Sequence, residues 1–169
     1  MKKYSKVIIN GEFFCNNLTG IERFAYEITK RLDVISKKDE IGIIVTRDAK
    51  NVPHFNNLKL INYDGDVRPF PKWQQFILPK ILKKQNAISL DFGNTCSLFY
   101  PGITFLHDIY CELYPEDFIT KHEKYERFYF RILYRIIAYR AKKIATVSCF
   151  SRDQIARAFH IKAKRISVI

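Results

Sequence analysis

The chain has 169 residues, of which 47% are hydrophobic, and it contains 14 Phe and 10 Tyr. This length and composition indicate about one globular domain and exclude an intrinsically disordered chain. No apolar run approaches the roughly 18 residues that a membrane-spanning helix needs, and we expect a cytoplasmic protein. The formal net charge of +12 favours an anionic partner and leaves nucleic acid, anionic lipid and nucleotide phosphate open.

Short β-rich runs alternate with longer helical patterns along the chain. In order, the predicted elements are a strand over 6–9, a helix over 20–36, strands over 41–46 and 58–62, a helix over 72–84, strands over 87–92 and 103–107, a helix over 118–141, a strand over 143–148, a helix over 149–158 and a strand over 165–169. Apolar runs of this kind, without alternation, are typical of strands that are buried on both faces. The predicted class is therefore α/β, with a doubly wound, mostly parallel sheet and helices on both faces.

Polar loops follow several of the predicted strands. In a doubly wound sheet, ligands bind in the crevice at the carboxyl ends of the strands. Each loop alone is more simply a turn or a capped helix, whereas four such loops at one edge predict a site. The polar groups at these ends are the loop over 10–20, Asn94 with Thr95, His107 with Asp108, and Ser148.

The first of these loops places Thr19 and Gly20 at the start of a predicted helix. Free backbone N–H groups and the positive helix end, about half a charge, favour a phosphate or a hydroxyl-rich ligand. A plain helix start explains the same residues equally well. The glycine patterns of dinucleotide-binding and P-loop proteins are absent from the sequence. The four histidines and four cysteines are too scattered for a metal site or a disulfide framework, so we expect neither a metal nor a cofactor.

His107 is the strongest candidate for chemistry. A neutral imidazole can donate to or accept from a sugar hydroxyl, and it changes charge near neutral pH. The adjacent Asp108 could orient the ring or bind hydroxyls itself, although a lone histidine at a strand end is more often a packed polar residue. Ser148 is placed to cap the helix that begins at Cys149, with Ser151 in its first turn, and capping alone would explain it.

Two amphipathic segments carry much of the positive charge. Basic segments with aromatic residues are typical of binding to membrane surfaces. For the segment over 72–84 this interpretation and a core-facing one stay open. For the helix over 118–141 we favour a core-facing apolar stripe backed by a solvated basic face. The predicted stripe is Tyr125, Phe128, Tyr129, Ile132, Leu133 and Ile136, and the predicted basic face is Lys124, Arg127, Arg131 and Arg135.

The chain resembles the N-terminal half of glycosyltransferase family 4 enzymes in five runs that occur in the same order. These runs are NGEFFCNNLTGIERFAYEIT, WQQFILPKILKK, ISLDFGNTCSLFYPGITFLHDI, AKKIATVSCFSRDQI and RISVI. Such enzymes are retaining, nucleotide-sugar-dependent transferases of the two-domain GT-B fold. The resemblance implies that residues 1–169 form one Rossmann-like, acceptor-side domain. It also implies that the donor-binding domain, with its E-x7-E pair, is absent from this chain, whose last predicted strand would normally lead onward to it.

The resemblance implies roles for individual residues. Thr19 and Gly20, with Arg23 of the same T-G-x-x-R motif, would face the donor phosphates, and His107 with Asp108 would lie near the transferred sugar. The cleft would be lined by Asn94, Thr95, Ser148, Phe150 and Ser151. Members of the family need no metal bound by a D-x-D motif and no protein nucleophile, so catalysis would rest on positioning and on stabilising the departing phosphate.

The expected function is transfer of a hexose from a nucleotide sugar to a glycan or lipid-linked acceptor, in the assembly of bacterial surface polysaccharide. The partners would be a C-terminal donor-binding domain, in the same or a separate chain, and the inner face of the plasma membrane as a peripheral contact. This chain alone is expected to be inactive. The alternative is a non-catalytic module that binds a glycan or a membrane surface. Nucleic-acid binding is not expected, because the sequence lacks a recognition-helix signature and an RNA-binding aromatic motif.

Overall fold

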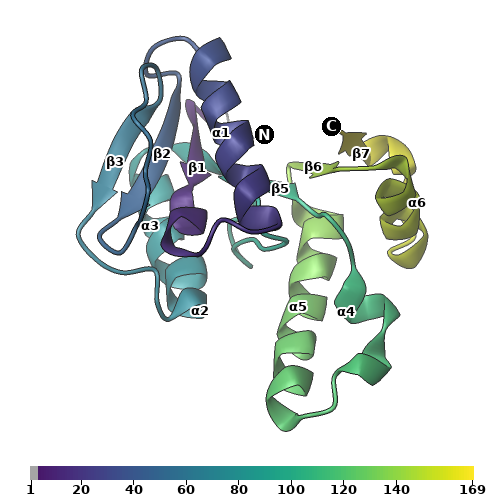
Figure 1. Cartoon of the computed structure of the whole chain (residues 1–169). Coiled ribbons are helices and arrows are strands. Elements are labelled where there is room, and N and C mark those ends of the chain that lie inside the picture. Colours follow the sequence, from purple (N-terminus) through teal and green to yellow (C-terminus); the bar gives the residue numbers. More distant parts are fainter. Residues whose placement is uncertain (1–3) are drawn as a thin grey trace. The chain divides into compact units, whose positions relative to one another are not determined.

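The computed structural model describes residues 4–169 of the chain (Figure 1). The chain divides into two compact units, Met1–Gly93 and Asn94–Ile169. In both units strands alternate with helices, and the paired strands run parallel. The predicted α/β, Rossmann-like class is therefore confirmed.

The first unit contains four parallel strands in the order β3-β2-β1-β4. They are β1 (Lys6–Asn10), β2 (Ile41–Thr46), β3 (Lys59–Tyr63) and β4 (Ala87–Asp91). β1 lies between β2 and β4, with Ile8 opposite both Gly42 and Ser89. The prediction of strands buried on both faces holds for most of β1, β2 and β4. It is wrong for β3, which is mostly exposed because it lies at the end of the strand order.

Helices cover both faces of this four-stranded sheet. α1 (Ile21–Ile35) connects β1 to β2, and the helical stretch of α2 (Phe70–Lys72), a π-helical turn η2 (Trp73–Ile77) and α3 (Leu78–Lys84) connects β3 to β4. The two connections cross the sheet in opposite directions. Because such crossovers are right-handed, α1 and α3 lie on opposite faces, as Figure 1 shows.

The end of α1 holds the chain segment that leads into β3. The carboxylate of Asp33 is buried and accepts hydrogen bonds from the backbone N–H groups of Asn56, Asn57 and Leu58, at 3.0, 2.8 and 2.8 Å. Burial alone would raise the pKa of Asp33, but these three donors outweigh it and lower the pKa. Asp33 is therefore a structural anchor in its ionised form.

The second unit contains three parallel strands in the order β5-β6-β7. Its elements are β5 (Ile103–Phe105), α4 (Tyr110–Leu113), a 3₁₀ turn η3 (Pro115–Asp117), α5 (Lys121–Arg140), β6 (Lys143–Thr146), α6 (Cys149–Ala158), a 3₁₀ turn η4 (Ala163–Arg165) and β7 (Ile166–Val168). Leu106, directly after β5, and Ile144 of β6 pack with Leu133 and Ile137 of α5 and Ile155 of α6 in one core. The two short elements between β5 and α5 were not predicted.

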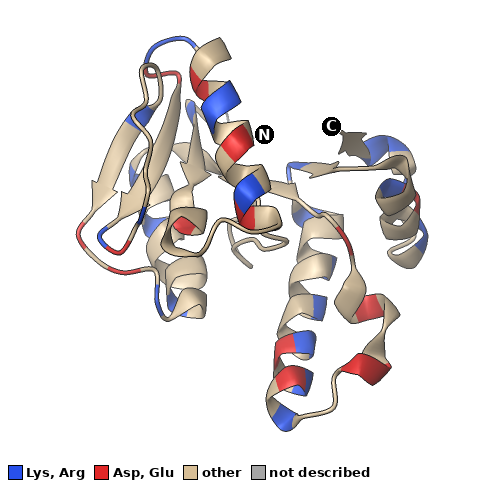
Figure 2. Cartoon of the chain, viewed as in Figure 1, with Lys and Arg blue, Asp and Glu red and all other residues tan. Residues whose placement is uncertain are grey.

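The prediction for the two faces of α5 is confirmed in part, because Leu133 is buried in the core and Tyr129 and Ile136 pack against it. Tyr125 and Phe128 of the supposed core stripe are 71% and 61% exposed, although Leu133 is buried as expected. On the predicted basic face Lys124 is exposed, while Glu112 of α4 pairs with Arg131 at 2.8 Å and with Arg135 at 3.1 Å, and both arginines stay partly accessible. Figure 2 shows basic and acidic residues interspersed along the N-terminal half of this helix.

The described helices include none that is both long enough and apolar enough to cross a membrane.

Candidate functional site

The carboxyl end of β5 places His107 beside Asn94, and both residues belong to the second unit. The backbone N–H of His107 donates to Oδ1 of Asn94 at 2.7 Å. Asn94 is buried and has a positive φ of 57°, a conformation that asparagine tolerates better than most residues. The imidazole ring of His107 stacks on Phe105, with 6.0 Å between ring centroids. The predicted neighbours are thus brought together, and the amide oxygen of Asn94 holds the backbone at His107.

Asp108 and Thr95 lie near these two residues in the chain. The exposed carboxylate of Asp108 accepts from the backbone N–H of Tyr110 at 3.0 Å, which helps α4 to begin. Thr95 is buried, and its hydroxyl has no hydrogen-bond partner within residues 4–169. An orienting role of Asp108 toward the His107 ring remains a prediction.

The start of α6 has the cap that the sequence predicts. Oγ of Ser148 accepts from the backbone N–H of Ser151 at 3.0 Å, and the two hydroxyls are also 3.0 Å apart. Phe150 is 71% exposed, and Cys149 is an exposed free thiol. Ser148 and Ser151 therefore have a structural role that does not require a ligand.

In the first unit, the loop after β1 begins with a tight 3₁₀ turn, η1 (Gly11–Cys15). Gly11 is buried against β2, where a Cβ atom would lie 2.1 Å from the carbonyl oxygen of Ile44. Gly20 has a positive φ of 50°, and a Cβ atom there would meet nothing within 4 Å. Gly11 is therefore required by packing, whereas Gly20 is required by backbone conformation in an open place.

Arg23 and Thr19 lie at the same end of α1. Both are exposed, and Nε of Arg23 pairs with Glu27 one turn along the helix at 3.3 Å. The backbone carbonyl of Thr19 accepts from the N–H of Glu22 at 3.1 Å, as at an ordinary helix start. Contact of this loop with phosphates remains a prediction.

Sequence reasoning missed a buried polar network in the first unit. It joins the carboxyl ends of β1 and β4 to the π-helical turn η2. Its members are Asn10, Glu12, Trp73, Gln74, Ser89 and Asp91. The polar residues of the runs NGE, WQQ and SLD supply five of these side chains, and a polar residue inside an otherwise buried strand end is the signal that could have revealed them.

The amide of Asn10 is the centre of this network. Its Oδ1 accepts from the indole N–H of Trp73 at 3.0 Å, and its Nδ2 donates toward Glu12 at 2.9 Å and Asp91 at 3.1 Å. Burial raises the pKa of Glu12 to about 8, with a further contribution from Asp91, while the Asn10 bond opposes the rise. Burial also raises the pKa of Asp91.

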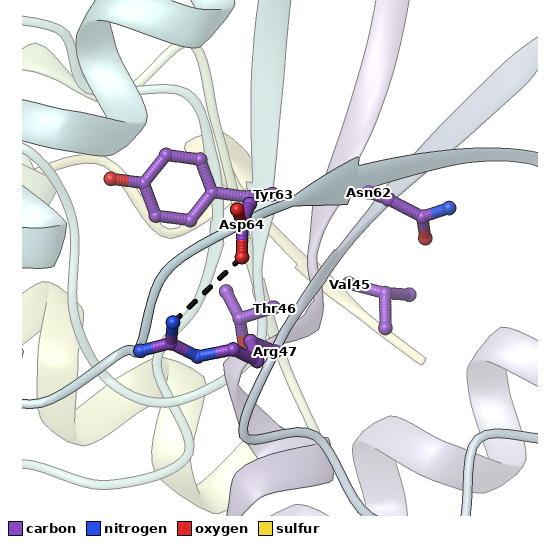
Figure 3. Close-up of a pocket in the computed structure, with 6 residues that line it drawn as sticks. All are labelled: Val45, Thr46, Arg47, Asn62, Tyr63 and Asp64. Atoms are coloured by element: carbon purple, nitrogen blue, oxygen red, sulfur yellow. Dashed lines mark ion pairs between the residues drawn. The ribbon is translucent and has the colours of Figure 1, made fainter.

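A hollow of about 310 Å³ lies at the carboxyl ends of β2 and β3 (Figure 3). Nη1 of Arg47 lies 3.8 Å from Asp64 there, and its guanidinium also makes two 3.1 Å bonds to Asp66. The positive charge is therefore already paired. The residues that line the hollow are Val45, Thr46, Arg47, Asn62, Tyr63 and Asp64, and none of them was predicted as a site residue.

Side chains suited to metal binding do not gather in the part of the chain that the structure describes: residues 4–169 contain no group of three or more His, Cys, Asp or Glu side chains that could hold an ion.

Part of the chain is similar to a curated transferase. Over 64 residues the chain is 38% identical to the O-antigen chain mannosyltransferase RfbU of Salmonella typhimurium (strain LT2). The matched stretch covers 38% of this chain and 16% of the Salmonella protein, so the chain spans only a small part of that relative's length. No protein-family model matches the chain.

Proposed function

We propose that the chain is the acceptor-side half of a retaining glycosyltransferase of the family 4 type, with the GT-B fold, which acts in the synthesis of a surface polysaccharide. The observation that carries the proposal is the 38% identity over 64 residues to an O-antigen mannosyltransferase. The α/β fold with parallel strands supports it, because this fold presents ligands at the carboxyl ends of its strands. The donor would be a nucleotide sugar, and a mannose donor is the first to test.

His107 is the proposed catalytic residue. It follows directly after β5, and its backbone is held by Asn94. The reference pKa of an imidazole is near 6.5. An imidazole can bind a sugar hydroxyl in either protonation state. Asp108, beside it in the chain, is the proposed second polar group at the transferred sugar.

Two helix starts are proposed to contact the substrates. Thr19, Gly20 and Arg23 would bind the donor phosphates, and the open backbone at Gly20 would allow their close approach. Thr95, Phe150 and the α6 start would line the acceptor side. Since no protein nucleophile takes part in this proposal, the rate would depend on positioning and on charge stabilisation at the leaving diphosphate.

The test uses the complete native gene product, purified and supplied with GDP-mannose as the donor probe and with total lipid-linked glycan from the source cells. We expect release of GDP, and we expect the His107→Ala variant to be slower by about 100-fold, the usual loss when one positioned acid–base group is removed. The matched control is His122→Ala, an exposed histidine on α5. Activity of His107→Ala within threefold of the wild type would refute the catalytic assignment.

The 169-residue chain alone is expected to release no GDP, because a transferase of this type needs its donor-binding domain. Turnover by the purified chain would refute the two-domain part of the proposal.

A second candidate is a non-catalytic module at a membrane surface. The exposed aromatic side chains Tyr125 and Phe128 on α5, in a chain of net charge +12, favour it. Co-sedimentation with vesicles of phosphatidylglycerol at low salt tests this candidate, and no binding under those conditions would eliminate it.

A further inference from the structure

We propose that Glu12 and Asp91 form a carboxyl pair that binds one proton between them at neutral pH, and that this proton holds η1 in place at the end of β1. The pair belongs to the buried network of the first unit. Proton binding by this pair is independent of glycosyl transfer, because the proposed reaction gives neither residue a role.

The contact with Trp73 fixes the orientation of the Asn10 amide. An indole N–H can only donate, so the contact with Trp73 at 3.0 Å identifies the other atom as Oδ1 of Asn10. Nδ2 of Asn10 must therefore face the two carboxyl groups, at 2.9 Å from Glu12 and 3.1 Å from Asp91. Both carboxyl groups are consequently held at a single nitrogen atom.

The network has fewer hydrogen atoms at Asn10 than it has acceptors. Nδ2 of Asn10 carries two hydrogens, yet three acceptors lie within 3.1 Å of it, the third being Oε1 of Gln74. Asp91 has other donors, namely the hydroxyl of Ser89 at 2.6 Å and Nε2 of Gln74 at 3.3 Å. A proton on one carboxyl group makes it a weaker acceptor, so that the two hydrogens of Nδ2 no longer face two charged carboxylates at once.

No positive charge compensates the two carboxyl groups within residues 4–169. Among residues 4–169 neither carboxyl group lies within ion-pair distance of a lysine, arginine or histidine. The titratable groups that face Glu12 are Asp91 from β4, Glu22 from α1 and the Cys15 thiol of η1 itself. Since all of them are acidic or neutral, two negative charges here would repel each other without compensation, and one proton removes the repulsion.

The two carboxyl groups are not equivalent. Asp91 is fully buried, which raises its pKa, but the bonds from Ser89 and Gln74, in addition to that from Asn10, oppose this rise by stabilising the carboxylate. Glu12 is only partly buried and shares one donor. We therefore place the proton on Glu12 and the negative charge on Asp91. The rise of the Glu12 pKa to about 8, caused by burial and by Asp91, agrees with this placement.

Loss of the proton has a structural consequence. It leaves two carboxylates at one amide nitrogen, and Glu12 is the member that can move toward water, because it lies in η1 and is partly accessible. Such a movement would disturb Asn10 and, through it, Trp73. Trp73 is the only tryptophan in the sequence and its side chain is buried, so its fluorescence reports on this network.

The test is a pH titration of the 169-residue chain between pH 5.5 and 9.5, followed by Trp73 fluorescence and by ¹³C NMR of chain labelled at the glutamate carboxyl carbon. We expect one carboxyl resonance with a midpoint near pH 8, absent from the Glu12→Gln variant, and a fluorescence change with the same midpoint that is also lost in that variant. The matched control, Glu116→Gln at an exposed position, should keep both transitions.

The Cys15 thiol does not account for a transition near pH 8, because burial raises its pKa to about 11. Titration of every glutamate carboxyl group below pH 6 would overturn the proposal, and so would an unchanged fluorescence transition in Glu12→Gln. The NMR measurement on the unsubstituted chain decides the question even if Glu12→Gln does not fold.

Discussion

Substitution of Asn94 tests how the structure positions His107. Asn94 combines a positive φ of 57° with a 2.7 Å hydrogen bond from its side chain to the backbone N–H of His107. Three variants separate these two features. Alanine loses both, glycine keeps the conformation and loses the hydrogen bond, and aspartate retains an acceptor oxygen and tolerates the conformation.

The magnitudes follow from the geometry. A residue with a Cβ atom that lacks asparagine's tolerance of this region costs about 1–2 kcal/mol, and a buried N–H left without a partner costs about 1–3 kcal/mol. We therefore expect a loss of about 3 kcal/mol in the free energy of unfolding for Asn94→Ala and about 2 kcal/mol for Asn94→Gly. Asn94→Asp should cost less than about 1 kcal/mol, since the acceptor oxygen remains.

The assay is urea denaturation followed by far-ultraviolet circular dichroism, together with hydrogen exchange of the His107 amide in the folded chain. Protection of that amide should fall in the alanine and glycine variants and persist in the aspartate variant. In the transferase that we propose, the turnover should follow the same order. Equal stability and equal amide protection in all three variants would show that the Asn94 side chain does not hold His107.

Three further predictions concern the framework around the site. Gly11→Ala should strongly destabilise the first unit, by more than about 3 kcal/mol, because the new Cβ atom would lie 2.1 Å from the carbonyl oxygen of Ile44; a thermal midpoint unchanged from wild type would contradict this. Asp33→Ala should cost about 3 kcal/mol at pH 7, where the carboxylate accepts three backbone N–H bonds. The pKa of Asp33 is lowered in the folded state, so this stabilisation is present above the reference value of 3.8 and is lost as the pH falls through the lower folded-state pKa. The free energies of unfolding of wild type and variant should therefore converge in acid. A constant difference down to pH 2 would refute the assignment. Thr120→Ala should cost about 1 kcal/mol, measured by urea denaturation, because it removes the capping box that Thr120 forms with Glu123 at the start of α5; Thr120→Ser should restore most of it.

The pattern of the sequence identifies the elements of this fold where the signal is local. Four-residue to six-residue apolar runs predict the strands, and the cap at Ser148 follows from its place before a helix. The contact between Asn94 and His107 spans 13 residues, and that between Asn10 and Asp91 spans 81. The strand ends predict that Asn94 and His107 lie at one edge but not the hydrogen bond between them, and the Asn10–Asp91 contact leaves no periodic trace at all.

The helix α5 shows why periodicity alone does not decide which face is buried. Its sequence offers an aromatic stripe and an arginine face, and hydrophobicity favours burying the first. Glu112, in a four-residue helix that was not predicted, draws Arg131 and Arg135 against α4 instead. Glu112 therefore adds two ion pairs to the arginine side of the helix, while Leu133 of the predicted stripe stays in the core.

Trp73 and Cys149 provide a fluorescence donor and an attachment site for an acceptor dye. Trp73 is a lone, buried fluorophore in the first unit, and Cys149 is an exposed thiol at the start of α6 in the second. A maleimide dye on Cys149 that absorbs tryptophan emission would make energy transfer between the two units measurable without any added residue. Titration of a nucleotide sugar into such a labelled protein would show directly whether a substrate draws the two units together or separates them.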